Sequence, residues 1–439
     1  MSNGYSLVGP MIENSSRTIE KALAINLDSQ IYGTICEIGA GQEVARWFFQ
    51  AGATAGTVAK TMSAYDMKFS DEIYGHAPGQ RYVSRFRLEQ MLQREFDLLL
   101  SRIQGEKATG TRFFAFANTV CAQGFQKREE CHGWVGVRFQ MYPQSDPDEI
   151  IIHVRMLDST NLAQQEALGI LGVNLIHGGF HLANVPQNLL VGLMDNLLWG
   201  RLEIDLVEFN GPNLGAVDSR LMALELVKSS LTRAVLFSPK GSVEIPADAL
   251  YRNSSLVMRG KFQNVIKSDL DRFIDARKRF QADIQVNHGI GEENILCIAE
   301  LTMAQTGAIP QVDVADYLAR VMRLTDSGFF VLISEFYRFF RLRQYIARYT
   351  TEPVALVTDL ADLGDMFCED HYEGLAGGIL EGIGKSFPPS TTAYVYPAMS
   401  EPSSLADASI KDNVRHVLDY LTSQNQIVLI SSCDVEDDE

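Results

Sequence analysis

Hydrophobic and polar positions along this chain fall into blocks that alternate between the patterns of strands and helices. Apolar runs of strand length occur at 32–38, 295–302 and 329–334, and each is followed by an amphipathic stretch that fits a helix. A long helix is predicted over 81–104, where large apolar residues recur at helical spacing. Repeated strand–helix units of this kind predict an α/β fold.

The two halves of the chain differ in how regular this alternation is. Residues 111–157 hold three strand-like runs separated by polar turns, which favours antiparallel pairing. After about residue 265 strands and helices alternate strictly, and the apolar strands suit a parallel sheet that is covered on both faces. We therefore predict an N-terminal α/β portion with some antiparallel strands and a C-terminal parallel, doubly wound α/β portion.

The predicted domains are residues 1–260 and 261–433, followed by an acidic tail, 434–439, that is expected to be disordered. About eight main β segments can be counted, so a single (β/α)8 barrel is the alternative fold. The length of 439 residues suits two domains or one large barrel.

Composition and charge narrow the range of possible binding partners. The formal net charge is −17, which repels phosphate backbones, so we expect no nucleic acid and no anionic membrane as partner. The sequence has no apolar run long enough to span a bilayer, and its start lacks the basic and apolar regions of a signal peptide. The six cysteines are irregularly spaced, which is typical of reduced thiols. These features together predict a soluble cytoplasmic protein.

The first candidate site is the glycine turn that follows the strand at 32–38. Gly39 and Gly41 would let backbone amides approach a ligand, and the following helix would direct its N-terminus at negative charge. The turn resembles the first glycine motif of nucleotide and S-adenosylmethionine sites, although the full G-x-G-x-x-G is not met. A plain strand-to-helix turn is the alternative.

The second candidate is the polar segment 60–87, which is predicted to be a loop ahead of the long helix. Its Lys60, Arg81 and Arg85 suit an anionic group. Long loops often cover a site. A surface connection with ion pairs is the alternative.

An acidic strand near 202–209 supplies a third candidate. We expect Glu208 and Asn210 near its C-terminal end, where ligands bind in α/β folds, and Arg220 on the next helix. A period of two would put Asp205 on one face and Glu208 on the other. These carboxylates could serve catalysis or bind a metal or ribose; a solvated strand edge is the alternative.

Two histidine segments are further candidates. Cys131 and His132 stand side by side at a strand start, as in a nucleophile–base pair or a metal site, but neighbouring strand residues point to opposite faces. A strand start with a buried cysteine is the alternative. His177 and His181 have the spacing of a zinc-binding helix, yet two glycines lie between them, so a loop over a pocket is predicted instead. Neither a metal nor a cofactor is identified by the sequence.

In the C-terminal half, polar residues stand at strand ends, where a doubly wound sheet places ligand groups. They include Glu300, Ser334, Glu335, Thr358 and Asp359. Their residue types are generic. The sequence contains no P-loop, no G-x-S-x-G and no kinase motif set, so it identifies no reaction.

Several segments together resemble a large bacterial family of about this length. They are 57–66, 70–75, 130–134, 208–212 and 220–222. Members of that family carry names such as nicotinate-nucleotide adenylyltransferase or TonB-dependent receptor. The first name implies a G-x-F-x-P-x-H-x-G-H motif, and the similar text at 178–186 lacks the His-x-Gly-His ending. The second implies a signal peptide and barrel strands, and we expect neither. The resemblance therefore implies nucleotide chemistry only in general terms.

We predict a protein that binds, and as an enzyme would transform, a phosphorylated or nucleotide-like small molecule. Its anionic part would meet Gly39, Gly41 and the segment 60–87, and Glu208, Asp205 and His132 would supply the polar chemistry. The alternative is a non-catalytic cytoplasmic scaffold that forms homo-oligomers, suggested by the clustered aromatic residues at 47–49, 329–330 and 339–340.

Overall fold

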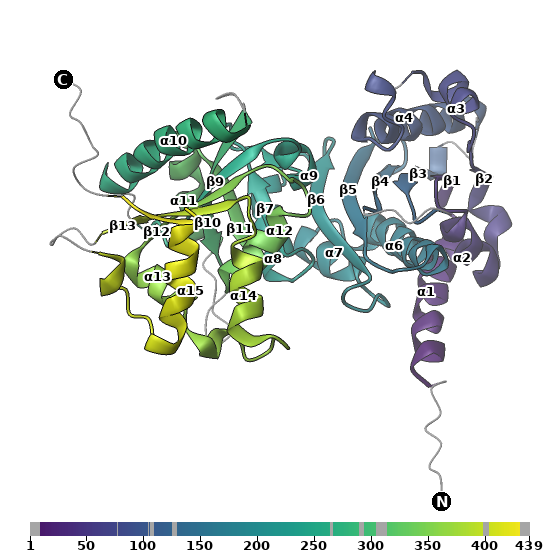
Figure 1. Cartoon of the computed structure of the whole chain (residues 1–439). Helices are drawn as coiled ribbons and strands as arrows, with labels where there is room; N and C mark the ends of the chain where they lie inside the picture. Colours follow the sequence, from purple (N-terminus) through teal and green to yellow (C-terminus); the bar gives the residue numbers. More distant parts are fainter. Residues whose placement is uncertain are drawn as a thin grey trace, which may run out of the picture. The chain divides into compact units, whose positions relative to one another are not determined.

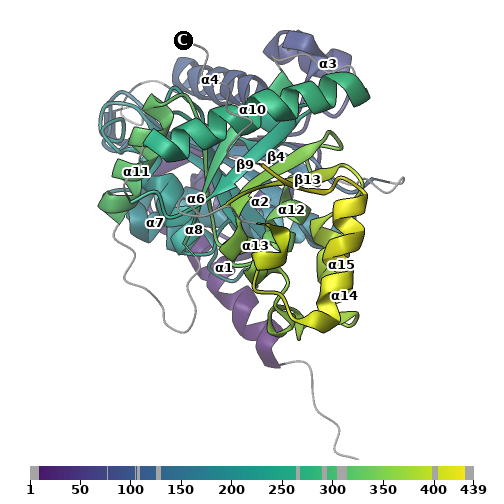
Figure 2. The ribbon, with the colours of Figure 1, turned by 60° about the vertical axis from the view of Figure 1, so that its left-hand side comes forward.

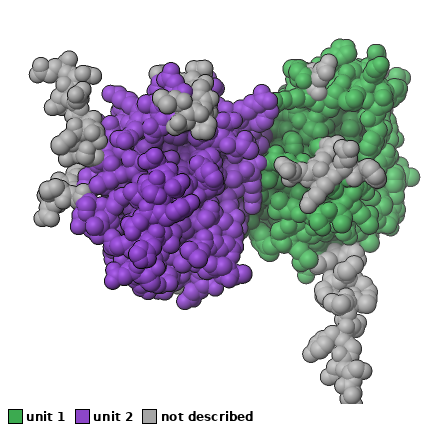
Figure 3. Space-filling model, viewed as in Figure 1, with its two compact units in different colours: residues 1–232 green, residues 233–439 purple. Residues whose placement is uncertain are grey.

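The computed structural model describes residues 9–430, apart from 77, 104, 106–108, 125–129, 264–266, 289–293, 304–313 and 398–403. The chain divides between Thr232 and Arg233 into two compact units, which Figure 3 shows in different colours. Each unit has its own sheet and its own core, and each is described by itself. The acidic tail predicted at 434–439 lies outside the described residues.

The first unit contains the following elements in chain order: α1 (Gly9–Leu27), β1 (Ile31–Ile38), α2 (Glu43–Ala51), β2 (Val58–Met62), α3 (Met67–Tyr74), α4 (Arg85–Arg102), β3 (Arg112–Cys121), β4 (His132–Phe139), β5 (Asp148–Met156), α6 (Asn161–His181), α7 (Pro186–Leu193), β6 (Leu202–Asn210) and α8 (Ser219–Lys228).

The sheet of the first unit is mixed, with strand order β2-β1-β3-β4-β5-β6. β2, β1 and β3 are parallel, and β3, β4, β5 and β6 are joined by antiparallel pairing. The antiparallel strands β3, β4 and β5 correspond to the three strand-like runs in 111–157, which the sequence separates by polar turns. Because β4 and β6 run opposite to β3, the ends of β1, β3 and β5 lie at the same edge of the sheet as the starts of β4 and β6. We call this edge the carboxyl edge of the first unit.

Helices cover both faces of this sheet. α1, α2, α6 and α7 pack over one face in a core that contains Ile35, Phe116 and Leu171, and α4 covers part of the other face through Leu92 and Phe96 (Figure 1). Side-chain caps define helix starts: the Thr160 side chain accepts from the amide of Ala163 at α6, and Ser84 accepts from Arg87 at α4.

The second unit contains these elements in chain order: β7 (Ala234–Phe237), β8 (Val243–Glu244), α9 (Pro246–Leu250), β9 (Ser254–Arg259), α10 (Lys267–His288), β10 (Ile295–Thr302), α11 (Val314–Asp326), β11 (Phe330–Ser334), α12 (Phe339–Ile346), β12 (Val354–Asp359), α13 (Leu360–Met366), α14 (Gly378–Ser386), β13 (Thr391–Tyr396), α15 (Asp412–Ser423) and β14 (Ile427–Leu429).

The second sheet has the order β14-β13-β12-β9-β10-β11-β7-β8. The strands from β9 to β14 are all parallel, and β7 and β8 extend the sheet beyond β11 by antiparallel pairing. Counted from β9 along the chain, the parallel strands lie in the order 3-2-1-4-5-6, which is the Rossmann order of a doubly wound sheet. The strand order therefore reverses between β9 and β12.

Helices lie on both faces of the second sheet. α10 lies on one face, and α13, α14 and α15 lie on the other (Figures 1 and 2). The core on the second of these faces includes Phe340, Leu363 and Leu418 packed against Val257 and Leu356 of the strands. Apolar residues of β9 and β12 are buried because both faces are covered, as the apolar strand pattern predicts.

The α/β fold predicted from the sequence is confirmed, including antiparallel strands in the N-terminal portion and a doubly wound C-terminal sheet. The barrel alternative is wrong, since the strands form two separate sheets. β7, β8 and β9 pair with strands of the second sheet, so residues 234–259 belong to the second unit and not to the domain predicted over 1–260. Among the described helices, none has the length and apolar character needed to cross a membrane.

Candidate functional site

The glycine turn of the first unit is closed by groups of the chain itself. Gly39 has a φ of +103°, and a Cβ there would lie 1.9 Å from the Val120 carbonyl oxygen, so only glycine fits. The amide of Gly41 donates to the Tyr65 hydroxyl at 2.9 Å. The tight turn that the sequence predicts is present. Of the two backbone amides predicted to bind a ligand, that of Gly41 already donates to a group of the chain.

The N-terminus of α2, which follows this turn, already faces a carboxylate. The amides of Val44 and Ala45 donate to the two oxygens of Glu37 at 3.2 and 3.0 Å. Burial raises the pKa of Glu37 to about 7, against the effect of these amides and of Asn118, which lower it. An internal acid therefore occupies the position that an anionic ligand would take at this helix start.

Lys60 is paired at the partly exposed end of a buried polar chain instead of standing free in a loop. It lies on the strand β2, and its Nζ is 2.5 Å from Oε2 of Glu95. The Tyr74 hydroxyl donates to the other oxygen of Glu95 at 2.9 Å and lies 3.0 Å from Sγ of Cys36. Burial raises the pKa of the Cys36 thiol to about 12, so this cysteine stays protonated and inert.

Arg85 and Glu208, predicted as ligand-binding and catalytic residues, pair with each other. An Nη2–Oε2 distance of 2.5 Å joins them, and Nε of Arg85 donates to Glu89 at 2.8 Å. Burial lowers the pKa of Arg85, but its pairing with Glu89 and Glu208 outweighs that effect and raises it overall. Arg81 is exposed in the segment that precedes α4.

The other two predicted catalytic residues are joined through a histidine that the sequence analysis missed. Nδ1 of His132 lies 3.0 Å from Nε2 of His153, and Nδ1 of His153 lies 2.6 Å from Oδ1 of Asp205. His153 and Asp205 are buried. We call these three residues the His–His–Asp chain. The available signal was a histidine inside the apolar run 150–154, where a buried polar side chain needs a partner.

Two expectations about the acidic residues of β6 are wrong: the faces on which Asp205 and Glu208 lie, and the edge of the sheet at which the strand ends. Ile204, Val207 and Phe209 all pack in the first core, and the pairing of β5 with β6 is irregular near His153. That irregularity puts Asp205 and Glu208 on the same face, not on opposite faces. β6 is also antiparallel to β5, so its C-terminal end lies at the edge opposite the ends of β1 and β3.

Asn210 and Arg220, both predicted to bind a ligand, lie next to a turn and at the start of a helix. Asn210 precedes a turn in which the amides of Asn213 and Leu214 donate to the buried carboxylate of Asp148. Gly211 there has a φ of +110°, and a Cβ would meet Asp148 at 2.6 Å. Arg220 forms a bidentate pair with the α8 cap Asp218 at 3.0 and 2.8 Å. These contacts explain the residues as turn and cap residues.

The two histidines of α6 lie on a continuous helix, so the loop predicted for them is wrong. α6 runs through Gly178 and Gly179, which lie against Leu189 and Phe139. The rings of His177 and His181 are 4.5 Å apart, and burial lowers the pKa of His177 to about 4. Among the described residues, no three His, Cys, Asp or Glu side chains gather closely enough to hold a metal ion.

The second unit has a polar crevice at the reversal of its strand order. Two hollows of about 250 and 70 Å³ share Arg259, Thr358 and Asp362 in their walls. Arg259 is the last residue of β9 and Asp359 the last of β12, and these neighbouring strands lead to helices on opposite faces of the sheet. We call this hollow the switch-point crevice. The larger hollow is somewhat smaller than the roughly 300–1,000 Å³ of typical small-molecule sites.

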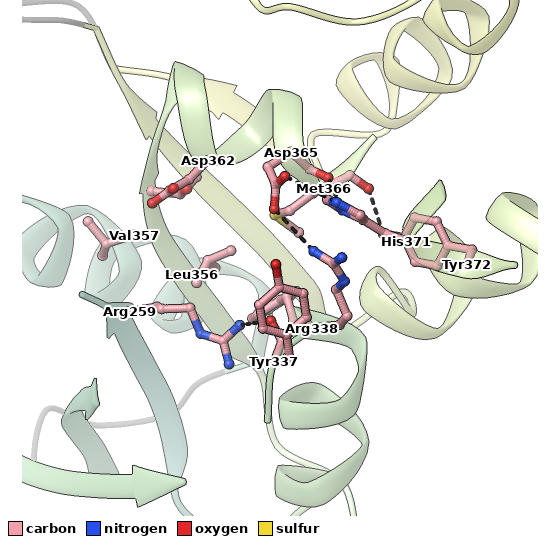
Figure 4. Close-up of a pocket in the computed structure, with 12 residues that line it drawn as sticks. Arg259, Tyr337, Arg338, Leu356, Val357, Asp362, Asp365, Met366, His371 and Tyr372 are labelled. Atoms are coloured by element: carbon pink, nitrogen blue, oxygen red, sulfur yellow. Dashed lines mark hydrogen bonds and ion pairs between the residues drawn. The ribbon is translucent and has the colours of Figure 1, made fainter. Parts of the chain in front are cut away.

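Cations line one side of the switch-point crevice. Arg259 donates from Nε to Glu300 at 2.6 Å and from Nη2 to the Phe336 carbonyl at 2.7 Å, which fixes its guanidinium. Arg338 precedes α12 and stacks 4.0 Å over the Tyr337 ring. Lys261 is exposed and follows β9 by two residues. Figure 4 shows Arg259 and Arg338 coming from different elements toward the same hollow.

Carboxylates line the other side, on and beside α13. Asp359 caps this helix by accepting from the amide of Asp362 at 2.8 Å. Burial and the charges of Asp359 and Asp365 raise the pKa of Asp362. Asp365 lies 3.4 Å from both Arg338 and His371. Figure 4 shows these three side chains beside one another. A molecule with an anionic group and several hydroxyls would find donors and acceptors here.

No protein-family model and no curated protein matches the sequence. Among solved structures, the chain is similar to the competence/damage-inducible protein CihA of Agrobacterium tumefaciens. The identity is 13%, the match covers 40% of this chain and 97% of that one, and the TM-score is 0.28. A CinA superfamily protein from Enterobacter cloacae has 14% identity, coverage of 41% and 98%, and the same TM-score of 0.28. Similarities this low say nothing about function.

Proposed function

We propose that the second unit binds a phosphorylated or nucleotide-like small molecule in the switch-point crevice. The place of the crevice is the main support. It opens at the carboxyl ends of β9 and β12, between which the strand order reverses. Ligands of open parallel sheets bind at such reversals, because the connections from the two strands leave toward opposite faces and keep the space between them open.

The charges of the crevice support an anionic ligand with hydroxyl groups. Lys261 and Arg338 can reach a phosphate from the side of β9 and α12, while Arg259 adds positive charge from the floor. Thr358 and Asp362 on the opposite wall can bond the hydroxyls of a sugar. We propose binding at this site and assign no reaction to it.

This proposal keeps the predicted ligand class and moves its site to the other unit. The cations Lys60 and Arg85 are already paired with carboxylates, and Glu37 already faces the start of α2. An anion at the predicted site would have to displace these internal partners. In the crevice, by contrast, Lys261 has no ion-pair partner among the described residues.

Calorimetry and thermal unfolding of the full chain test the proposal. AMP, NAD, ribose 5-phosphate and inorganic phosphate are titrated, and at least one organic phosphate is expected to bind and to stabilise the protein. Lys261→Glu and Arg338→Glu should each weaken that binding about tenfold or more, since a charge-assisted contact contributes about 1.5–3 kcal/mol. Lys240→Glu is the matched control, because Lys240 is exposed between β7 and β8 at the far edge of the same sheet.

Two outcomes would contradict the proposal. Either none of the four phosphates binds, or one binds with an affinity that Lys261→Glu and Arg338→Glu leave at the level of the Lys240→Glu control.

Homo-oligomer formation stays a prediction. The clustered aromatic residues on which it was based support it less than the sequence suggested. Trp47, Phe48, Phe339 and Phe340 are buried within the cores of their own units, and Phe49 is the member that stays 56% exposed. Aromatic residues buried in a monomer core are explained without a partner copy. Light scattering coupled to size-exclusion chromatography measures the oligomeric state directly.

A further inference from the structure

A separate hollow of the second unit lies beside α10, at the edge of the sheet opposite the switch-point crevice. Its volume of about 320 Å³ lies within the roughly 300–1,000 Å³ of small-molecule sites. Ile295 and Phe330, the first residues of β10 and β11, border it, whereas the crevice is bordered by the last residues of β9 and β12. We call this hollow the α10 pocket.

Most of the wall of the α10 pocket is apolar. One stripe of α10 supplies Leu270, Phe273 and Ile274, which follow one another at helical spacing. Phe329 packs edge-on against Phe273, with ring centroids 4.7 Å apart. Ile274 stays 53% exposed although it borders the hollow. An apolar ligand in the pocket would remove this side chain from water, which is favourable.

The polar groups of the wall suit a single negative charge. Arg277 continues the same stripe of α10, is exposed, and is the one charged residue among the described residues that line the pocket. The Ser327 hydroxyl already donates to the Arg323 carbonyl at 2.9 Å. The Gly328 amide donates to the Thr325 carbonyl, also at 2.9 Å. One guanidinium without further donors matches a carboxylate, which arginine binds through two parallel hydrogen bonds.

Cys297 lies in the wall of the pocket on β10. Ile295 and Cys297 line the hollow, whereas Leu296 and Ile298 pack in the core on the opposite face of the sheet, as strand alternation requires. Cys297 is partly accessible to solvent. Burial raises the pKa of its thiol, and the positive charge of Arg277 opposes this effect, so the guanidinium and the thiol lie near each other. The thiol can therefore report whether the pocket is occupied.

We propose that the α10 pocket binds a small apolar carboxylate, with the shape of a medium-chain fatty acid. Its chain would lie between α10 and the starts of β10 and β11, and its carboxylate would pair with Arg277. Burial of the chain supplies most of the affinity, and the ion pair fixes the orientation of the ligand. This site does not depend on the switch-point crevice, because the two hollows lie at opposite ends of the parallel strands.

Calorimetry of the full chain with octanoate gives the first test. One octanoate per chain is expected to bind, and octanamide, which has the same chain without the charge, should bind about tenfold more weakly. Arg277→Gln should weaken octanoate binding about tenfold, because a charge-assisted contact is lost, and should leave octanamide binding unchanged. Lys278→Gln is the matched control, since Lys278 is exposed on α10 and does not line the pocket.

Alkylation of Cys297 gives the second test, which locates the ligand. Iodoacetamide is added with and without octanoate, and peptide mass spectrometry follows each cysteine with time. Octanoate should slow the reaction of Cys297 about tenfold when about nine-tenths of the sites are filled. Cys368 is the internal control, because it is also partly accessible but follows α13 and does not line the pocket. Its rate should not change.

Three outcomes would overturn the proposal. The first is that octanoate does not bind at millimolar concentration, or binds in many copies per chain. The second is that octanamide binds as tightly as octanoate, or that Arg277→Gln binds octanoate as tightly as the Lys278→Gln control. The third is that bound octanoate leaves the alkylation rate of Cys297 unchanged, which would place the ligand elsewhere.

Discussion

The charged residues of the two units differ in what they face. In the first unit Lys60, Arg85 and Arg87 are each paired with a carboxylate of the chain, and even the start of α2 faces an internal acid. In the second unit Lys261 borders a hollow and has no ion-pair partner among the described residues, although its neighbours Arg259 and Arg338 pair with Glu300 and Asp365. A run of charged residues in a sequence can thus serve structure or binding, and the number of internal partners distinguishes the two.

The comparison predicts that loss of a paired charge in the first unit costs stability, whereas loss of a crevice charge costs only binding. The strongest test is Arg87→Ala. Arg87 is 1% exposed, and its guanidinium contacts Asp71 at 2.6 Å and the Ser70 carbonyl at 3.2 Å. Its removal leaves a cavity, takes a donor from the buried Ser70 carbonyl and removes the ion-pair partner of Asp71, which keeps its hydrogen bond from Tyr82, so the free energy of unfolding should fall by about 3 kcal/mol.

Urea unfolding followed by tryptophan fluorescence measures this change, because the signal comes from the first unit alone. Arg94→Ala is the control on an exposed position of the same helix, where a change within about 0.5 kcal/mol is expected. Similar effects of the two substitutions would remove the structural explanation for the buried pair.

The second prediction concerns the pH dependence of the first unit. The folded pKa of Glu37 is about 7 and its ordinary value is 4.5, so between these values the folded state binds more protons than the unfolded state. The stability from Glu37 is complete below pH 4.5 and is lost as the pH rises through 7. Glu37→Gln keeps an acceptor for the α2 amides without a charge, and at pH 8 it should be more stable than the natural protein by about 3 kcal/mol.

Unfolding at pH 5 and pH 8 checks this sign. The difference between Glu37→Gln and the unchanged protein should be small at pH 5 and large at pH 8. A difference that does not change with pH would mean that Glu37 is ionised throughout this range.

A smaller effect is expected for the pair of Arg85 and Glu208. Both side chains are partly exposed, so water screens the pair, and a double-mutant cycle with Arg85→Ala and Glu208→Gln should give a coupling energy of about 0.5–1 kcal/mol. The same cycle measured on the binding of an anionic ligand should show no coupling. A loss of ligand affinity in these variants would mean that the ligand binds in the first unit and not in the switch-point crevice.

The smallest effect on stability is expected in the switch-point crevice. Lys261→Glu should leave the free energy of unfolding of the second unit within about 0.5 kcal/mol, because the side chain is exposed and no ion pair is broken. Far-UV circular dichroism during urea unfolding measures this for the full chain. A loss as large as that of Arg87→Ala would mean that Lys261 is a structural residue.

Much of the secondary structure follows from local patterns. The strand β10 begins and ends where the apolar run at 295–302 predicts, and α4 lies within the helix predicted over 81–104. β2 was missed because it is a short edge strand with Lys60 at its centre, so it lacks the apolar run of a buried strand. The unit boundary was placed too late because β8 and α9 are short, and strict alternation begins only after them.

The candidate sites were harder to predict than the elements. Glycine spacing correctly indicated the tight turn at Gly39, but the sequence contains no sign that Glu37 and Tyr65 occupy its donors. Polar strand ends such as Thr358 indicated the region of the switch-point crevice. Arg259 could not be linked to them, because the neighbours β9 and β12 are about 100 residues apart in the chain.

The sequence by itself determined the α/β class, the positions of most strands and helices, and the acidic character of the chain. These properties depend on periodicity and composition, which are local or additive. Only the tertiary structure decided which elements are neighbours: the 3-2-1-4-5-6 order of the strands, the meeting of Arg259 with Asp362, and the approach of α10 to the starts of β10 and β11. Backbone hydrogen bonds between strands are nearly the same for any pair, so pairing is set by burial across the whole sheet.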